Sequence, residues 1–332
     1  MINIAKLIAT IEKSVEAHNL GKTGAYCRFL KTGEKKLNPY GCADTACILY
    51  TIGKLPSGKD KKIWVETLQA MQNPEDGLFK DWDTAHYLHN TIHTTAFCIA
   101  ALELFDAKPL HKLKALEYLC DPKKMEEFLD KFDWESNPWN ESHKGAGVFS
   151  ALVLAGEVDL KWEKRYFDWL NEEFDPKTGL LRKGFVKPIR LWDTYTTIFP
   201  HLAGTFHYMF NMEYRHFKLR YPTELVETCL GLIENDEFKL GRSVGFSEID
   251  WVFCLNRALK QSGHRVDDCK KALMEFAKAY IDFLSGLDIM GFEDVHGTFG
   301  ALCCLAELQQ ALPGEIKTEI PLKQILDRRP FI

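Results

Sequence analysis

The fold is predicted most clearly by one stretch of the sequence, Ile92-His93-Thr94-Thr95-Ala96-Phe97-Cys98-Ile99-Ala100-Ala101-Leu102-Glu103-Leu104. It begins with polar side chains and continues with small and apolar ones. The polar residues do not recur at a spacing that would leave one face of a helix exposed to water. We therefore expect a helix that other elements cover on all sides.

Looser copies of this stretch recur along the chain. Each copy has an aspartate or histidine, then small residues, then an apolar run, and the lead residues are Asp44, His93, His143, Asp193, Asp250 and His296. The intervals between consecutive lead residues are 49, 50, 50, 57 and 46 residues. Self-similarity at a period near fifty is the signature of a repeat architecture, and it predicts six units.

A second kind of helix alternates with these apolar stretches. Its members have apolar residues three and four positions apart on one face and lie near 2–18, 59–72, 122–132, 162–173, 221–235 and 266–285. An apolar helix must be covered all round, whereas an amphipathic one needs a single partner face. Strand signals are almost absent. We predict an all-α (α/α)6 toroid of six helical hairpins that forms one domain over residues 1–332.

This alternation makes the inner helices parallel, so their N-termini surround one mouth of the ring. The six lead residues fall at that mouth. The unsatisfied N–H groups and the positive dipole ends of the helices would favour an anionic group or a developing oxyanion there. The mouth is the predicted site.

Composition excludes several classes of protein. The chain has 332 residues, of which 46% are hydrophobic and 27% charged, which is ordinary globular composition. A net charge of −5 gives no basic surface for nucleic acid. No apolar run is long enough to span a membrane, and no secretory signal is evident. The ten cysteines favour a reduced, cytoplasmic protein. The oligomeric state is left open.

The loops Gln72-Asn73-Pro74-Glu75-Asp76-Gly77-Leu78-Phe79 and Phe174-Asp175-Pro176-Lys177-Thr178-Gly179-Leu180-Leu181 resemble those of (α/α)6-toroid enzymes. One branch is the six-hairpin glycosidases and polysaccharide lyases, in which the mouth binds sugar through aromatic residues and Asp, Glu, His or Tyr does the chemistry. The other is the terpenoid cyclases and protein prenyltransferases. The first loop is similar to a degraded Gln…Gly-x-Trp repeat, and Ala43-Asp44-Thr45-Ala46 to the tail of the cyclase Asp-x-Asp-Asp-Thr-Ala motif.

The sequence departs from the second branch and from a further family. Gly41-Cys42-Ala43-Asp44 lacks the other two acids of the cyclase motif, and no Asp-Asp-x-x-Asp motif occurs to hold magnesium and diphosphate. His296-Gly297 is similar to the His-Gly step of lanthipeptide cyclases, whose Trp-Cys zinc motif is missing. These departures favour the carbohydrate-active branch.

Carboxylates at the mouth are the first candidates for catalysis. We expect Asp193, Asp250 and Glu248 to serve as general acid and base, with His143 assisting. The alternative for each aspartate is N-capping, which stabilises a helix by roughly 1 kcal/mol. A pair of carboxylates across a cleft would suit glycoside hydrolysis, with their separation setting the stereochemical outcome.

Histidines and aromatic residues complete the predicted site. The imidazoles at helix N-termini should be neutral and can accept or donate a proton. Tryptophan and tyrosine would stack on sugar rings, and a basic run ending at Arg190 would clamp a substrate carboxylate. The predicted substrate-binding residues are Asp44, His93, Trp139, Arg190, Trp192, Tyr195, Trp251, Asp294 and His296. We predict no metal and no cofactor.

The residues together favour a carbohydrate-active enzyme, a glycoside hydrolase or lyase, acting on a small-molecule or oligosaccharide substrate such as one that contains uronic acid. The alternative is a terpenoid-cyclase-like or prenyltransferase-like toroid that binds an isoprenoid, because an aromatic pocket stabilises a carbocation. A third possibility is a catalytically inert toroid that scaffolds a partner, with its acids serving only as helix caps.

Overall fold

The computed structural model describes residues 1–31, 35–81, 90–191, 195–235, 239 and 241–332. Over these residues the chain is predominantly helical, as the two alternating helix patterns predict. In this part of the chain, helices whose residues are mostly buried alternate with helices that expose one face.

The mostly buried helices follow the predicted apolar stretches. They are α2 (Pro39–Thr51), α4 (Thr91–Leu104), α6 (Pro138–Ala155), α8 (Phe199–Tyr214), α10 (Ser247–Ser262) and α12 (Val295–Ala311). In α4, the stretch from His93 to Leu102 is buried without interruption. This matches the expectation that its apolar residues leave no face for water.

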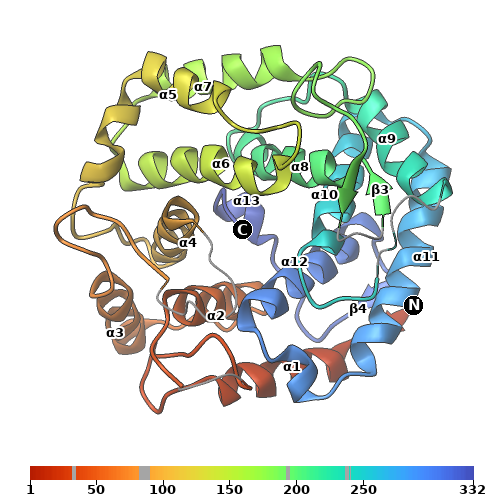
Figure 1. The fold of residues 1–332 in the computed structure, drawn as a ribbon. Coiled ribbons are helices and arrows are strands. Elements are labelled where there is room, and N and C mark those ends of the chain that lie inside the picture. Colours follow the sequence, from red (N-terminus) through yellow and green to blue (C-terminus); the bar gives the residue numbers. More distant parts are fainter. Residues whose placement is uncertain (32–34, 82–89, 192–194, 236–238, 240) are drawn as a thin grey trace.

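The helices with one exposed face lie at the periphery in Figure 1. They are α1 (Ala5–Ala17), α3 (Gly58–Gln69), α5 (Pro122–Asp130), α7 (Leu160–Glu173), α9 (Pro222–Glu234) and α11 (Val266–Ser285). Each agrees with its predicted range to within four residues at either end. In α1 the buried side chains are Leu7, Ile11, Ser14 and Val15, which share one helical face.

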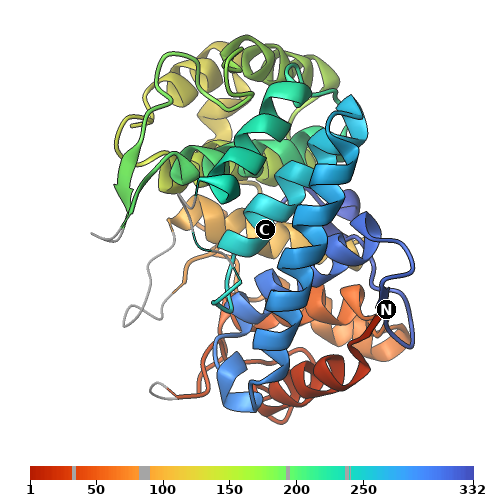
Figure 2. The ribbon, with the colours of Figure 1, turned by 90° about the vertical axis from the view of Figure 1, so that its right-hand side faces the viewer.

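The mostly buried helices contact one another in a closed cycle. Each contacts the next along the chain, from α2 to α4, α6, α8, α10 and α12, and α12 contacts α2. Among the helices with one exposed face, α11 contacts both α9 and α1. Helices from the two ends of the chain therefore lie side by side (Figures 1 and 2). The first and last thirds of the chain are thereby joined.

Shorter elements connect or close these helices. The 3₁₀ helices η1 (Lys114–Cys120) and η2 (Ile289–Phe292) precede α5 and α12. Strand β1 (Ile2–Asn3) pairs in parallel with β4 (Ile316–Lys317), and β2 (Ile189–Leu191) pairs antiparallel with β3 (Tyr195–Thr197). The last helix, α13 (Ile325–Arg328), lies inside the ring of helices in Figure 1.

One helix begins later than the repeat predicts. We expect the fourth apolar helix to start at Asp193, but α8 starts at Phe199, after the β2–β3 hairpin. The interval of 57 residues, the longest in the series, reflects this hairpin. The repeat therefore locates the helix correctly in the chain but misplaces its first turn.

Glycines allow a loop to pack directly on the start of α12. A Cβ atom on Gly297 would lie 2.6 Å from the carbonyl oxygen of Val244, and one on Gly300 would lie 2.6 Å from that of Gly245. Both glycines are therefore required for the loop before α10 to approach α12. No helix within the described part of the chain is long and apolar enough to cross a bilayer.

Candidate active site

A cavity of about 350 Å³ opens where the N-terminal ends of α4, α6 and α12 converge. Its lining consists of Arg28, Phe29, His93, Trp139, His143, His207, Val244, Gly245, Phe246, Asp294, His296, Gly297 and Ile332. The volume is in the range of small-molecule sites. This is the end of the inner helices at which the sequence predicts the site.

Four histidines form a continuous row along this cavity. The ring of His143 lies 4.6 Å from that of His93 and 4.1 Å from that of His207, measured between centroids. The His93 ring is in turn 6.0 Å from that of His296. The four side chains come from α6, α4, α8 and α12, so the row depends on the packing of four separate helices.

The proton position on His207 follows from its hydrogen bonds. The Ser142 hydroxyl donates to the carbonyl oxygen of Trp139 at 2.7 Å, and the same Oγ atom lies 2.7 Å from Nδ1 of His207. A hydroxyl has one proton, so Nδ1 of His207 must be the donor in the second bond. The neutral ring then has its lone pair on Nε2.

Two other imidazoles are held through their Nδ1 atoms. The Tyr40 hydroxyl lies 2.6 Å from Nδ1 of His93, and the Nδ1 atom of His296 lies 3.2 Å from both carboxylate oxygens of Asp44. A phenol that donates to Nδ1 fixes the His93 proton on Nε2, while a carboxylate that accepts from Nδ1 leaves the lone pair of His296 on Nε2. The row thus contains both proton donors and proton acceptors.

Burial keeps His143, His207 and His296 uncharged at neutral pH. It lowers the pKa of His296 to about 3, with an added contribution from the Arg28 guanidinium, and it lowers the pKa of His143 to about 3. Burial also lowers the pKa of His207 well below its ordinary value. It raises the pKa of Asp44, against the opposing charges of Arg28 and Arg329. The Asp44–His296 pair therefore contains a neutral imidazole.

A buried arginine organises the rim next to His296. Arg28 donates through Nε and Nη2 to the two carboxylate oxygens of Asp294, at 3.2 and 3.3 Å, and through Nη1 to Asp81 at 3.2 Å. Asn38 donates to the other oxygen of Asp81 at 3.0 Å. The guanidinium also lies over the Tyr40 ring, 4.8 Å from its centroid. These contacts fix Asp294, which caps α12 by accepting from the backbone N–H of His296.

Aromatic side chains form the remaining walls. The Phe246 ring is 4.5 Å from that of His296, and the Trp139 ring is 5.6 Å from that of Phe199 on α8. Phe29 lines the cavity beside Arg28. The site therefore combines flat apolar surfaces with hydrogen-bonding imidazoles, which suits a ring with polar edges.

The structure brings together five of the residues predicted from the sequence. His93, Trp139, His143, Asp294 and His296 all line the cavity. Asp44 does not line the cavity itself. It contacts Nδ1 of His296, which does. Asp44 does not cap α2, since Asn38 accepts from the first N–H groups of that helix.

Three further predicted residues lie outside the cavity lining. Glu248 accepts hydrogen bonds from the backbone N–H of Gly241 and the hydroxyl of Ser243. Both carboxylate oxygens of Asp250 are buried without a hydrogen-bond partner among the described residues. Trp251 donates its indole N–H to the carbonyl oxygen of Cys229 at 2.9 Å. Burial raises the pKa of both acids, with the charge of Glu248 adding to the rise at Asp250.

Two further predicted residues, Arg190 and Tyr195, belong to the hairpin before α8. Arg190 is exposed in β2 and pairs with Thr196, while Tyr195 belongs to β3. None of the residues that line the described cavity comes from these two strands. Trp192 and Asp193 lie outside the described residues.

Several residues of the site carry no clear signal in the sequence. His207 lies in the third turn of α8, away from the helix start that the repeat marks. Arg28 and Tyr40 lie before the first lead residue, and only their contacts with Asp294 and His93 reveal their place. The presence of His201 and His207 on one apolar helix is the signal that could have pointed to α8.

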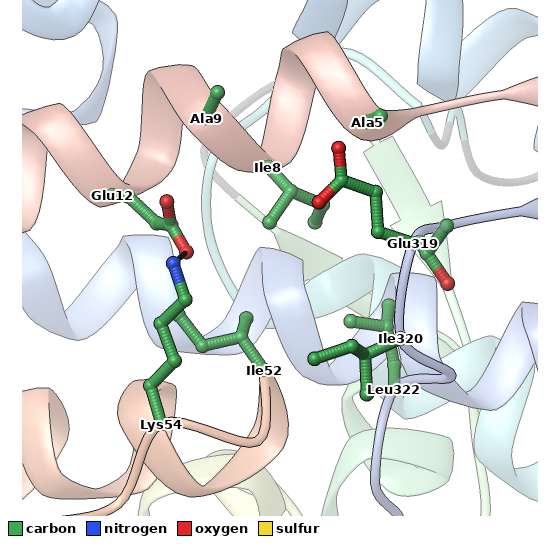
Figure 3. Close-up of a pocket in the computed structure, with 10 residues that line it drawn as sticks. Ala5, Ile8, Ala9, Glu12, Ile52, Lys54, Glu319, Ile320 and Leu322 are labelled. Atoms are coloured by element: carbon green, nitrogen blue, oxygen red, sulfur yellow. Dashed lines mark ion pairs between the residues drawn. The ribbon is translucent and has the colours of Figure 1, made fainter.

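The described residues give less support to a metal site or to a ligand in a second pocket. Over the described ranges, no group of three or more His, Cys, Asp or Glu side chains has the arrangement to hold a metal ion. A smaller pocket of about 110 Å³ lies between α1 and the far end of α2 (Figure 3). Its polar residues include Glu12 and Lys54, which form an ion pair at 2.5 Å. Because Glu12 and Lys54 neutralise each other, neither charge is left to bind a charged ligand in this pocket.

The chain was compared with known proteins at three levels. No family model, no curated protein and no solved structure matches it. The function is therefore inferred from the residues of the cavity.

Proposed function

We propose that the protein is an (α/α)6-toroid enzyme that acts on a carbohydrate by acid–base catalysis in the imidazole-lined cavity. The closed cycle of contacts from α2 to α12 and back supports the toroid. The observation that carries the function is the row of four histidines in one cavity, three of them oriented through Nδ1 by Tyr40, Ser142 and Asp44. Oriented neutral imidazoles are suited to proton transfer at pH 7.

The roles in this proposal follow from the proton positions. His296, with Asp44 on Nδ1, has a lone pair on Nε2 and acts as the general base. His93 accepts from Tyr40 and has its proton on Nε2, so it acts as the general acid together with Tyr40. As Nε2 gives its proton to the departing oxygen, Nδ1 takes the proton of the Tyr40 hydroxyl, and the resulting phenolate lies beneath the Arg28 guanidinium. Their ring centroids are 6.0 Å apart, which allows both to contact one bound sugar. Trp139 and Phe246 would stack against the sugar ring.

Elimination is favoured over hydrolysis. Hydrolysis of a glycoside ordinarily uses two carboxylates on opposite sides of the bond. Among the described lining residues, Asp294 has the one carboxylate side chain, and Arg28 engages both of its oxygens. Elimination from a uronate needs one base to remove the proton next to the carboxylate and one acid to protonate the departing oxygen. The carbon–oxygen bond then breaks as a carbon–carbon double bond forms.

The substrate class that fits is an oligosaccharide containing uronic acid. The N-terminal ends of α4, α6 and α12 surround the cavity and favour an anionic group. An assay with uronate oligosaccharides should give a product whose conjugated double bond absorbs ultraviolet light. His296→Gln should reduce the rate by about 10²-fold or more. The exposed control His216→Gln should retain the wild-type rate. Absence of unsaturated product with every uronate oligosaccharide would refute elimination.

A second candidate is an isoprenoid-binding toroid. The observation in its favour is the set of aromatic walls, Phe29, Trp139 and Phe246, since aromatic faces stabilise a carbocation. Thermal shift separates the two candidates. Uronate oligosaccharides should raise the melting temperature if the first is right, and prenyl diphosphates if the second is right. Because Trp139 lines the cavity in both cases, Trp139→Ala should abolish either shift.

A further inference from the structure

The segment 325–332 occupies the interior of the ring of helices. Figure 1 shows α13 surrounded by the mostly buried helices, and α13 contacts α8 and α2. Two ion pairs fix it there. Asp327 lies 2.8 Å from Nη1 of Arg257 on α10, and Nη1 of Arg328 lies 2.6 Å from Glu103 on α4. The segment is therefore attached to helices on different sides of the ring.

The next two residues are held by groups on the inner helices. Arg329 is fully buried, with its guanidinium over the rings of Phe97 and Phe299, 4.9 and 5.3 Å from their centroids. The carbonyl oxygen of Pro330 accepts from the Ser150 hydroxyl at 2.5 Å and from the Asn211 amide at 2.8 Å.

Ser150 and Asn211 are polar residues on the mostly buried helices α6 and α8, and both are completely buried. The Asn211 amide also donates to Ser150, while its oxygen accepts from the Tyr166 hydroxyl at 2.8 Å. These side chains satisfy one another and the carbonyl oxygen of Pro330, so the three helices that carry them provide a specific seat for the segment.

Phe331 and Ile332 bring the segment up to the cavity. Phe331 is fully buried, and its ring lies 5.0 Å from that of His93 in an edge-to-face arrangement and 5.7 Å from that of Phe210. Ile332 lines the cavity itself. Below the histidine row, the interior of the ring is thus filled by side chains of the segment 325–332.

We propose that Phe331 and Ile332 form the floor of the imidazole cavity and determine its specificity, restricting it to the terminal unit of an oligosaccharide. Helices and the loops at 28–29 and 244–246 line the cavity at the sides and the floor closes it below, so a ligand enters through the mouth. An interior stretch of a long chain would need a second exit. Phe331 is also a positioning residue, because its ring packs against His93. The restriction to a terminal unit rests on the proposed carbohydrate function, whereas the floor does not.

The floor is tested without any substrate. Replacing Phe331 by Leu and Ile332 by Ala should open apolar space beneath His93, and benzene binds such space. Benzene should then shift the His93 C2–H resonance in NMR spectra of this variant and leave it unchanged in the wild type. The control Phe149→Ala opens a cavity beside Trp162 and Tyr166, and benzene should not shift His93 there. If the doubly substituted protein shows no shift, Phe331 does not support His93 and the floor is overturned. Should that protein not fold, Ile332→Ala alone is judged by the same resonance.

The restriction to a terminal unit is tested with uronate oligosaccharides of increasing length. The affinity of the wild type should stop rising once the terminal unit fills the cavity. The affinity of the doubly substituted protein should rise about tenfold with one further sugar unit, which corresponds to 1.4 kcal/mol. Affinity that keeps rising with every unit in the wild type would overturn the restriction. If no oligosaccharide binds while benzene still reports the open floor, the proposed carbohydrate function fails and the floor remains.

Discussion

The Nδ1 atom of His296 lies 3.2 Å from each carboxylate oxygen of Asp44. The two residues are 252 positions apart in the chain and belong to α12 and α2. These are the helices whose contact closes the cycle. The orientation of the proposed base therefore depends on the first and last inner helices packing together, and any change that separates them should affect catalysis before it unfolds the protein.

Replacing Asp44 by Asn should remove the acceptor that fixes the His296 proton on Nδ1. The amide can present its N–H₂ group to Nδ1, which would favour the wrong tautomer of the imidazole. We expect the turnover number to fall by about 10²-fold or more with little change in KM, because the interaction acts on proton transfer. Steady-state kinetics on the uronate substrate measure this.

The matched control is Asp159→Asn, at the N-cap of α7, where the side chain accepts from Lys161 and Trp162. It should change stability by about 1 kcal/mol or less and leave the turnover number unaltered. Equal turnover in Asp44→Asn and wild type would remove Asp44 and His296 from the mechanism.

The buried histidines should make the protein sensitive to acid. The pKa of His143 is lowered by burial to about 3, below its ordinary value of about 6.5. Between these values the unfolded state binds the proton and the folded state does not, so stability falls as pH falls below 6.5. His143→Gln should therefore reduce the loss of stability between pH 7 and pH 5 by about 2 kcal/mol, measured by urea denaturation.

The exposed His216 provides the comparison for this experiment. His216→Gln should leave the difference in unfolding free energy between pH 7 and pH 5 as it is in the wild type. If His143→Gln behaves like His216→Gln, the His143 imidazole is not protected from protonation in the folded state. Carboxyl groups also titrate in this range, but their contribution is common to the variant and the wild type and cancels.

Replacing Arg28 by Met should destabilise the fold by about 3–5 kcal/mol, because Asp81 and Asp294 would lose their buried cation. Adding Asp294→Asn should recover about 1–3 kcal/mol of this loss, since the two residues interact directly. Denaturant unfolding of both single variants and the double variant gives the coupling. Arg165→Met, which removes an exposed pair with Glu126, should change stability by about 0.5 kcal/mol or less. Strict additivity of Arg28→Met and Asp294→Asn would contradict the contact.

The alternation of helix types was predictable from the sequence because periodicity depends on local pattern alone. Both helix families occur near their expected places, except that α8 starts at Phe199 and not at Asp193. His93, His143 and His296 meet at one cavity as their equivalent positions predict. The sequence does not determine where the carboxylates of Asp250 and Glu248 point, since an acid near a helix start can face the axis of the ring or face away from it. Glu248 instead accepts from Ser243 and Gly241.

The remaining parts of the site depend on contacts between distant segments. Arg28 reaches Asp294 across 266 positions, and no local pattern encodes that pairing. The segment after Ile325 is too short to show periodicity, so its place inside the ring could not be inferred from its spacing. The relation of His207 to the other histidines is hidden in the sequence because the β2–β3 hairpin displaces the start of α8.

The packing of α6 against α8 gives a last prediction, which requires no substrate. A Cβ atom on Gly145 would lie 2.1 Å from the hydroxyl oxygen of Tyr208, and that hydroxyl is buried without a partner among the described residues. Gly145→Ala should therefore destabilise the wild type by about 1–3 kcal/mol. Tyr208→Phe should be neutral or slightly stabilising because it removes an unsatisfied polar group. In the Tyr208→Phe variant, Gly145→Ala should lower the free energy of unfolding by less than it does in the wild type. The hydroxyl oxygen, which is the atom closest to the added Cβ, is absent there.

Thermal and urea denaturation of the two single variants and the double variant measure this coupling. The control is Gly231→Ala on α9, where the nearest atom to an added Cβ is 3.9 Å away. It should stabilise the protein by about 0.5–1 kcal/mol, the ordinary gain of alanine over glycine in a helix. If Gly145→Ala costs the same with and without the Tyr208 hydroxyl, then α6 and α8 do not approach as closely as this contact requires. The positions of His143 and His207, which those two helices carry, would then have to be revised as well.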